Sequence, residues 1–588
     1  MTEAALQFET VDRIGRVAAV DTSQVWIRSD DPSIVTRIGV GHLIAIQGAT
    51  PREFLIGLTQ RITRNTREDF VDTDGVLDVE LDEILLDTVP DDMIRVVLVG
   101  TFRTVDGDRK NIFKRGADSL PCIEAECFYV QSGNLQRLMG LLGAELHENE
   151  RLVLGHYLID RESTAIASGD KFFQRHAAIL GSTGSGKSWT VALLLERAGS
   201  LTHPNIIVLD MHGEYAPLSK ANGGFAGGYR IAGPGDLDSP KEGVVFLPHW
   251  LLNHEEMLSM LLDRSEENAP NQASRFTKHV ADLKEDTLRA AEKSEVLKTF
   301  TVDSPIPYRP SDLVQRLQED NTRKGVGVGG REIKGEWEGK LTRFITRLES
   351  KLKDRRYGFL YKSPAASLEY EWLEAQVLQF LGSTGDSTPG IKIVDFSEVP
   401  SDVLPVVVAV FARLLYDVQF WMSPDKRTPV SLICDEAHLY LPRREGADAV
   451  AQQSLQVFER IAKEGRKYGF SIVPVSQRPS DVSHTILSQC NNFLALRLTN
   501  DQDQSVIRRL MPDSLVGMTD VLPLLDTGEA LVLGDAVLLP SRIRLAEPKI
   551  KPASATRNFW TDWGQVAPEA QAIRDAVEAL RSQSRPRA

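Results

Sequence analysis

The stretch that decides the fold is AAILGSTGSGKSWT, residues 177–190. It starts with an apolar run, continues through a turn dense in glycine and ends in residues that favour a helix. Within it Gly181, four intervening residues and then Gly186-Lys187-Ser188 have the spacing of a phosphate-binding P-loop. A strand before the loop and a helix after it are the context in which this motif is specific. The stretch therefore predicts a site for a nucleoside triphosphate, and we expect ATP.

Each residue type in this loop has a physical role. Glycines let the backbone turn so that several N–H groups face phosphate oxygens. The helix that begins near Lys187 directs its positive end to the same place. We expect Lys187 to meet the β- and γ-phosphates and the Ser188 hydroxyl to ligate Mg²⁺. The predicted nucleotide contacts are Gly181, Thr183, Gly184, Ser185, Gly186, Lys187, Ser188 and Trp189.

A second acidic motif completes the predicted site. SLICDEAH (431–438) is an apolar strand that ends in Asp435 and Glu436. We expect Asp435 to bind Mg²⁺ through water and Glu436 to polarise the attacking water. Strand ends often carry acids, so this pair is specific only together with the P-loop. In SIVPVSQRP (471–479), Gln477 at a strand tip is predicted to report whether the γ-phosphate is present.

The choice of catalytic base has one rival. VLDMHGEY (208–215) places Asp210, His212 and Glu214 after another strand, so Glu214 competes with Glu436 for this role. One histidine without a second ligand motif argues against a separate metal site. These three residues are expected to line the nucleotide pocket or a contact between subunits.

A basic helix end precedes the Gln477 strand. In ERIAKEGRKYGF (459–470) the cations can simply be solvated, because a helix C-terminus favours positive charge. The functional alternative is an arginine that enters the ATP site of a neighbouring copy. Arg466 is the candidate, because a guanidinium can contact two phosphate oxygens at once. Arg508 and Arg509 are the reserve candidates.

The segments around the P-loop predict an α/β fold. Near-continuous apolar strands with helices between them are typical of a parallel sheet covered on both faces. Between 250 and 385 this pattern stops, and amphipathic segments indicate an all-helical insertion. The predicted strands are 176–181, 205–210, 391–396, 430–436, 470–477 and 491–498.

The N-terminal region has a different pattern. Residues 10 to about 135 alternate like short strands, one of them VELDEILL (79–86), and this predicts a small antiparallel barrel. The expected domains are a barrel over 1–135, an ATPase core in two parts over 136–250 and 386–550, a helical bundle over 251–385 and a C-terminal tail over 551–588.

Composition limits the function classes. The 588 residues are 42% apolar and 26% charged, which is ordinary for a soluble protein of several domains. A net charge of −14 argues against a surface coated for nucleic acid, although a local basic channel is compatible with it. Four cysteines in so long a chain form no disulfide framework, and we expect buried thiols.

The sequence predicts a cytoplasmic protein. The N-terminus lacks the basic and apolar regions of a signal peptide. The most apolar segment, 403–421, carries Pro405, Arg413 and Asp417, which favours a buried helix over a membrane span.

The motifs in this order resemble the HerA family, hexameric DNA translocases of the HerA–FtsK branch of RecA-like ATPases. RHAAILGSTGSGKS, VLDMHGEY, LICDEAHLYLP, GRKYGFSIVPVSQRPSDV and TGEALVLGD carry the resemblance. It implies a RecA-like core with an N-terminal barrel and a helical insertion. It also implies a homohexamer with ATP sites between subunits and double-stranded DNA in the pore. By position, Lys187, Ser188, Asp435, Glu436 and Gln477 match the family's site, and Arg466 its trans arginine.

The resemblance further implies a partner that docks on the barrel. In such systems it is a nuclease of the NurA type or another nuclease in DNA end processing, or a nuclease or sirtuin-like NADase in anti-phage defence. The 248 residues between Lys187 and Asp435 (435 − 187) depart from the archaeal pattern, which weakens any transfer of pore-loop details.

A chain with net negative charge can still bind DNA if its basic loops converge on the central channel of a ring. Six copies of one cation then make a ring of positive charge. The candidate DNA contacts are Arg443, Arg444, Arg323, Lys324 and Arg331, although for each residue taken alone a solvated surface charge is the favoured interpretation. Two other functions share the same ATP site. One is a ring-shaped scaffold that assembles and switches a partner effector, and the other is a peripheral ATPase of secretion or conjugation.

Overall fold

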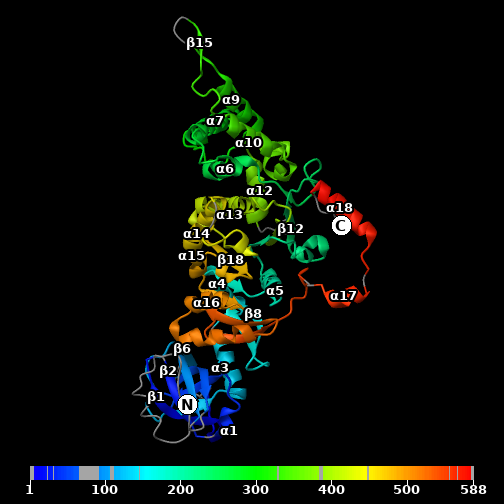
Figure 1. The fold of residues 1–588 in the computed structure, drawn as a ribbon. Coiled ribbons are helices and arrows are strands. Elements are labelled where there is room, and N and C mark those ends of the chain that lie inside the picture. Colours follow the sequence, from blue (N-terminus) through cyan, green and yellow to red (C-terminus); the bar gives the residue numbers. More distant parts are fainter. Residues whose placement is uncertain are drawn as a thin grey trace. The chain divides into compact units, whose positions relative to one another are not determined.

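The computed structural model of the chain separates into two units. Figure 1 shows the helices and strands of the chain, coloured by residue number. Unit 1 consists of residues 1–172, 179–186 and 491–547, and unit 2 of residues 173–178, 187–490 and 548–588. The structure describes residues 6–22, 24–30, 32–64, 92–105, 111–144, 146–326, 330–382, 389–445, 449–554, 557–565 and 567–583.

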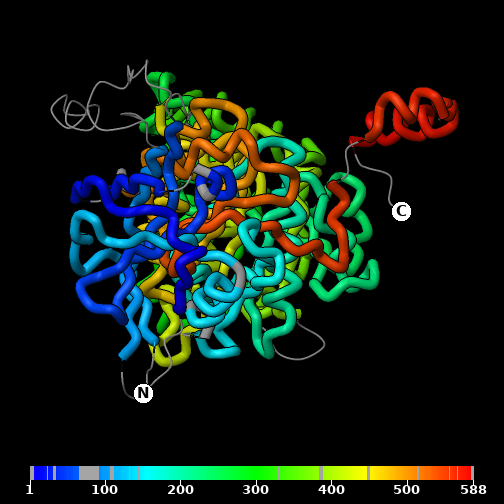
Figure 2. Tube along the Cα trace, turned by 90° about the horizontal axis from the view of Figure 1, so that it is seen from below, coloured from blue at the N-terminus to red at the C-terminus, as the bar shows by residue number. Residues whose placement is uncertain are grey.

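Unit 1 begins with a closed antiparallel barrel. The strand order is β2-β1-β7-β3-β4-β5-β6, and β2 also pairs with β5, so six strands close on themselves. Closure removes the exposed strand edges that would otherwise pair with other chains. The strands, blue to cyan in Figure 2, are β1 (Arg13–Val20), β2 (Gln24–Ser29), β3 (Leu43–Gln47), β4 (Glu53–Thr63), β5 (Met93–Thr104), β6 (Asn111–Arg115) and β7 (Glu126–Tyr129).

Apolar side chains at alternating positions of the strands fill the interior of the barrel. In β1 and β2 buried and half-buried residues alternate, and Ile14, Val17, Val25 and Ile27 share one apolar core. The strand predicted at 79–86 lies outside the described residues. The short helix α1 (Pro32–Val35) follows β2, and α3 (Ser132–Ala144) follows the barrel.

The cysteines divide into two groups. Cys127, Cys434 and Cys490 are buried free thiols, as predicted. Cys122 is exposed, so the prediction of a buried thiol was wrong there. It lies in the segment between β6 and β7, next to the turn at 123–124.

A second group of strands in unit 1 is antiparallel, in the order β19-β20-β21-β8-β9. The strand predicted at 491–498 is β19, and its antiparallel neighbour β20 was not among the predicted strands. Only short loops join β8 to β9 and β20 to β21, and short connections allow antiparallel neighbours alone. The strands are β8 (Arg151–Tyr157), β9 (Thr164–Ser168), β19 (Asn492–Ala495), β20 (Glu529–Gly534) and β21 (Ser541–Leu545).

Unit 2 contains the parallel sheet, and with it the predicted α/β fold class is confirmed. Its order is β13-β12-β16-β11-β17-β18. Every residue of β11, β17 and β18 is buried, as expected of parallel strands covered on both faces. The strands are β11 (Ile206–Asp210), β12 (Gly227–Ile231), β13 (Val244–Val245), β16 (Ile391–Asp395), β17 (Val430–Cys434) and β18 (Phe470–Ser476). The strand β10 (Ala177–Leu180) is divided between the two units.

Helices accompany these strands. The longest apolar one, α13, has the length and hydropathy to cross a membrane, but 56% of that window is buried inside the protein. A buried core helix passes the same test. The helices are α4 (Gly169–Gln174), α5 (Lys187–Gly199), α13 (Leu404–Trp421), α14 (Ala449–Glu464), α15 (His484–Gln489) and α16 (Asp501–Leu510).

A helical region lies between β13 and β16 in the chain. Two further helices lie near the C-terminus, after β21. Each of the longer helices between β13 and β16 buries one apolar face, as Phe276, Val280 and Leu283 do in α7. The elements are α6 (His254–Leu261), α7 (Ala269–Ala290), α8 (Ser294–Leu297), α9 (Pro310–Thr322), β14 (Gly325–Val326), β15 (Glu332–Ile333), α10 (Thr342–Lys353), α11 (Gly358–Tyr361), α12 (Trp372–Leu381), α17 (Phe559–Gln565) and α18 (Ala570–Ser582).

Candidate functional site

The predicted phosphate loop joins β10 to α5, and its backbone requires glycine. Gly184 and Gly186 have φ angles of 74° and 106°, in the region that side chains rarely adopt. A Cβ atom at Gly181 would lie 2.6 Å from the Ser185 hydroxyl oxygen and 2.8 Å from Cβ of Leu496. Glycine at these positions is therefore needed for the conformation of the loop itself.

Within unit 2, the helix after the loop begins with a buried cation. Lys187 is only 9% exposed, and burial lowers the pKa of its ammonium group. Three carboxylates, those of Glu436, Asp435 and Glu214, act in the opposite direction on that pKa. Three carboxyl groups beside one ammonium offer more acidic ligands than a single cation needs, which suits a second, divalent cation.

Ser188 already has a carboxylate partner. Its Oγ donates a hydrogen bond to Oε2 of Glu214 at 2.7 Å. Glu214 is held in place because Asp210, which is fully buried, accepts hydrogen bonds from the backbone N–H groups of His212, Gly213, Glu214 and Tyr215 at 2.8–3.2 Å. Burial raises the pKa of Asp210 to about 6.

The two acids after β17 have different surroundings. Asp435 is 4% exposed, and burial raises its pKa well above the ordinary value. Burial alone would also raise the pKa of Glu436, but His438 and Lys187 outweigh it and hold that pKa below the ordinary value. Different pKa values for adjacent carboxyls are typical of sites that use them in different roles.

Glu436 has a carboxylate oxygen without a hydrogen-bond partner among the described residues, and an uncommon backbone conformation. Its φ of 45° places it in the left-handed region, where a side chain is uncommon. Its Oε2 is buried without a hydrogen-bond partner among the described residues, and lies 3.3 Å from Nδ1 of His438 without the alignment of a hydrogen bond. A buried acceptor without a partner fits a site that accepts a proton from a bound water.

Gln477 and Arg466 lie at opposite ends of β18. Gln477 directly follows the strand, and β18 runs parallel to β17, so Gln477 lies at the same edge of the sheet as Asp435. Arg466 is exposed in the 3₁₀ turn η10 (Gly465–Tyr468) before the strand begins. At 3.3 Å a residue the two edges are about 20 Å apart, so Arg466 cannot reach the phosphate site of its own chain.

Some cations proposed for DNA already have acidic partners. The guanidinium of Arg444 pairs with the buried carboxylate of Glu459 at 2.5 Å, and Lys324 pairs with Glu332 at 2.6 Å. Arg443, Arg323 and Arg331 are exposed. The reserve candidate Arg508 pairs weakly with Asp520, and Arg509 is exposed.

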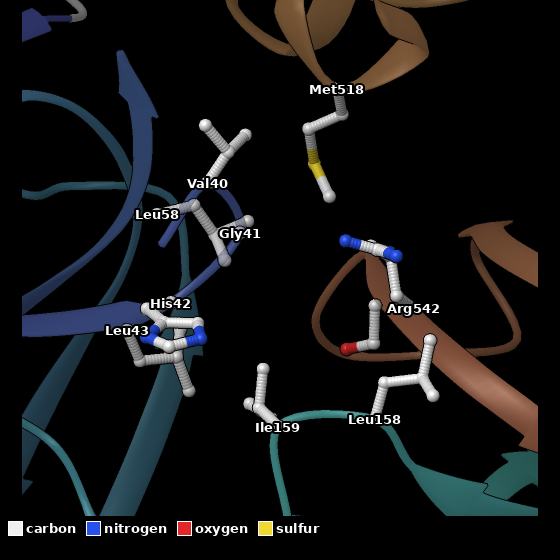
Figure 3. Close-up of a pocket in the computed structure, with 10 residues that line it drawn as sticks. Val40, Gly41, His42, Leu43, Leu58, Leu158, Ile159, Met518 and Arg542 are labelled. Carbon is white, nitrogen blue, oxygen red and sulfur yellow. The ribbon is translucent and has the colours of Figure 1, made fainter. Parts of the chain in front are cut away.

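A separate cavity of about 240 Å³ occurs within unit 1. Figure 3 shows Arg542 and Met518 facing Val40 and His42 across it. Burial, assisted by the charge of Arg542, lowers the pKa of His42. No predicted nucleotide-binding or catalytic residue lines this cavity, so it is not the phosphate site.

The chain is similar to several known proteins. Residues 152–415 match the family described as Helicase HerA, central domain. This match covers less than half of the 588 residues, so the chain is similar to the HerA family in its central domain. A probable helicase of Methanocaldococcus jannaschii is 26% identical over 75% of this chain and 74% of its own. The DNA double-strand break repair helicase HerA of Pyrococcus furiosus is 24% identical over 72% of this chain and 74% of its own.

The sequence identity to solved structures is lower than the identity to these relatives. VirB4 of Thermoanaerobacter pseudethanolicus has a TM-score of 0.43 and 15% identity, covering 71% of this chain and 99% of that one. The plasmid coupling protein TrwB, solved with a non-hydrolysable ATP analogue, has a TM-score of 0.43 and 17% identity, covering 72% and 94%.

In this chain, sequence reasoning missed two neighbours of the site. His438 lies two residues after Glu436, so its position in the motif could have indicated it. Lys551 lies over the ring of Trp189, with its ammonium 4.7 Å from the ring centre. No local pattern could have indicated that contact, because the two residues are far apart in the chain.

Proposed function

We propose that this chain is an ATP-driven motor that moves double-stranded DNA through a ring of six copies. The observation that carries the proposal is the buried ammonium of Lys187 among the carboxylates of Asp435, Glu436 and Glu214. The residues fit Mg²⁺ and a triphosphate, because the set offers a glycine loop, an ammonium, a hydroxyl and carboxylate oxygens. The relatives named as HerA helicases support DNA as the substrate.

The proposed mechanism assigns one task to each side chain. Lys187 holds the β- and γ-phosphates, and Ser188 and Asp435 hold Mg²⁺, which when bound neutralises developing phosphate charge. Glu436 takes a proton from the attacking water through its unpartnered oxygen. Gln477 lies at the same edge of the sheet as Asp435 and responds to whether the γ-phosphate is present.

Arg466 acts in another copy. Because it lies at the opposite edge of the sheet from its own Asp435, its phosphate contact belongs to the neighbouring subunit. A site shared between copies links hydrolysis in one to movement in the next. Exposed cations, Arg443, Arg323 and Arg331 among them, supply contacts to the DNA backbone that do not depend on sequence.

The barrel of unit 1 is the proposed docking place for a partner, a nuclease or a sirtuin-like NADase. DNA end processing and anti-phage defence are both consistent with such a pair. We further propose that the protein acts in the cytoplasm.

The test is ATP hydrolysis with and without linear duplex DNA, together with displacement of a third strand from a DNA triplex. The wild-type chain should hydrolyse faster with DNA and displace the strand, and Lys187→Ala should do neither. Native mass measurement with nucleotide should give six copies. Full hydrolysis by a single copy, unaffected by DNA, would contradict the motor.

A further inference from the structure

A short segment near the C-terminus lies along the P-loop helix of unit 2. We call residues 548–553 the strap. The backbone N–H of Lys549 donates to Oε2 of Glu196 at 2.6 Å, and the backbone N–H of Ala553 donates to the carbonyl of Glu214 at 2.7 Å. Pro548 and Pro552 are buried. The strap is therefore fixed on both sides of Lys551.

Between these two anchor points the strap meets an aromatic ring. The ammonium of Lys551 lies 4.7 Å from the ring centre of Trp189, within the range of a cation–π contact. Trp189 and Glu196 are seven residues apart on α5, so they lie on the same face of the helix. The strap follows that face, and the Lys551 ammonium lies over one side of the ring.

Trp189 is also close to the phosphate loop in sequence. It directly follows Ser188 in the first turn of α5, and it is half-buried. A triphosphate held by Lys187 and Ser188 must direct its ribose and base past the side chains that flank the loop. Among those side chains, Trp189 offers a planar face on which any base can stack.

We propose that Trp189 and Lys551 form the subsite for the nucleoside part of the bound nucleotide, an inference that rests on the proposed ATP site. The base stacks on the indole ring, and the Lys551 ammonium moves aside to donate to the ribose or the base. The backbone anchors at Lys549 and Ala553 let the side chain move while the strap stays. Every base can stack on an indole ring, so the subsite adds affinity for a nucleoside and does not select one base.

The test compares ATP with inorganic tripolyphosphate, which has the phosphates but no nucleoside. Both are titrated with Mg²⁺ into the full-length chain by calorimetry. Trp189→Ala should weaken ATP binding about 10-fold or more and change tripolyphosphate binding less than about twofold. Trp189→Phe should keep most of the ATP affinity, and Lys551→Ala should weaken ATP alone.

Trp421 is the matched control, because it is 82% exposed at the end of α13 and Trp421→Ala should change neither affinity. Equal losses for ATP and tripolyphosphate in Trp189→Ala would mean that the ring only supports the loop, and would overturn the subsite. Unchanged ATP affinity would overturn it as well. If the wild-type chain bound neither compound, the ATP site itself would be wrong, which is a different result from loss of the subsite.

Discussion

At the scale of single residues, the two candidate bases differ in what their carboxylates already bind. Glu214 accepts the hydrogen bond of Ser188, whereas Glu436 keeps a buried oxygen without a partner among the described residues. We therefore expect Glu436→Gln to lower kcat by about 10²- to 10⁴-fold, the usual contribution of a general base. ATP affinity should stay close to that of the wild type. Steady-state hydrolysis and equilibrium binding of a fluorescent ATP analogue measure the two effects.

Glu214→Gln is the matched variant for this test. Its amide can still accept from Ser188, so we expect a smaller loss of kcat than for Glu436→Gln. Normal hydrolysis by Glu436→Gln, with a large loss in Glu214→Gln, would move the role of the base to Glu214.

His438 sets the pH range in which Glu436 can act. Its ring lies 3.3 Å from the Glu436 carboxylate and contributes to holding that pKa below the ordinary value. Removing it in His438→Asn should raise the pKa of Glu436. Because a base must be deprotonated, the acidic limb of the kcat profile should move to higher pH. The measurement is kcat from about pH 3.5 upward, so that the range includes values below the ordinary pKa of a glutamate. A limb that stays in place would argue that Glu436 is not the titrating base.

At the scale of secondary-structure elements, one buried ion pair joins α6 to α13. The guanidinium of Arg413 donates to both oxygens of Glu256 at 2.8 Å and to the carbonyl of Leu251 at 2.8 Å. Arg413→Met would leave the fully buried Glu256 charged and without its cation, which costs about 3–5 kcal/mol. We expect a clear drop in the urea midpoint of unfolding, followed by circular dichroism.

The double variant Arg413→Met with Glu256→Gln should recover part of that loss. The amide oxygen can still accept from the backbone N–H of Asn253 that caps α6, and no buried charge remains. Lys278→Met is the surface control, because the exposed Lys278–Asp282 pair should contribute less than about 1 kcal/mol. An equal loss in the double variant would mean that Arg413 acts through packing and not through charge.

The elements that the sequence predicted are those with a strong local pattern. Fully apolar runs flanked by turns gave β10, β11, β16, β17, β18 and β19 to within a few residues. β4 was not predicted, because its first seven residues are all buried and show no alternation, and the exposed tail of the strand is polar. β6 has only five residues, mostly exposed, and offers no apolar period.

In the candidate site, too, local motifs could be predicted from the sequence and long-range contacts could not. The P-loop and the acids after β17 follow from spacing, because each motif is local and its chemistry needs fixed residue types. The hydrogen bond between Ser188 and Glu214, and the strap over Trp189, depend on contacts between distant parts of the chain. Such contacts come from tertiary packing and leave no periodic signal in the sequence.

At the scale of the whole molecule, the position of Arg466 makes a prediction about assembly. It lies about 20 Å from the phosphate edge of its own sheet, so under the proposed mechanism the arginine that completes a site comes from another copy. Arg466→Ala should bind ATP normally but hydrolyse little of it, and Lys187→Ala should also be inactive.

Mixing the two inactive variants gives the decisive measurement. In mixed rings, some sites combine an intact Lys187 from one copy with an intact Arg466 from its neighbour, so hydrolysis should return in part. The recovered rate should depend on the mixing ratio and be highest when the two variants are equal in amount. If Arg466 served its own chain, every site in every mixture would lack one group and no ratio would restore hydrolysis. Arg508→Ala and Arg509→Ala, mixed in the same way with Lys187→Ala, test whether a different arginine supplies the charge.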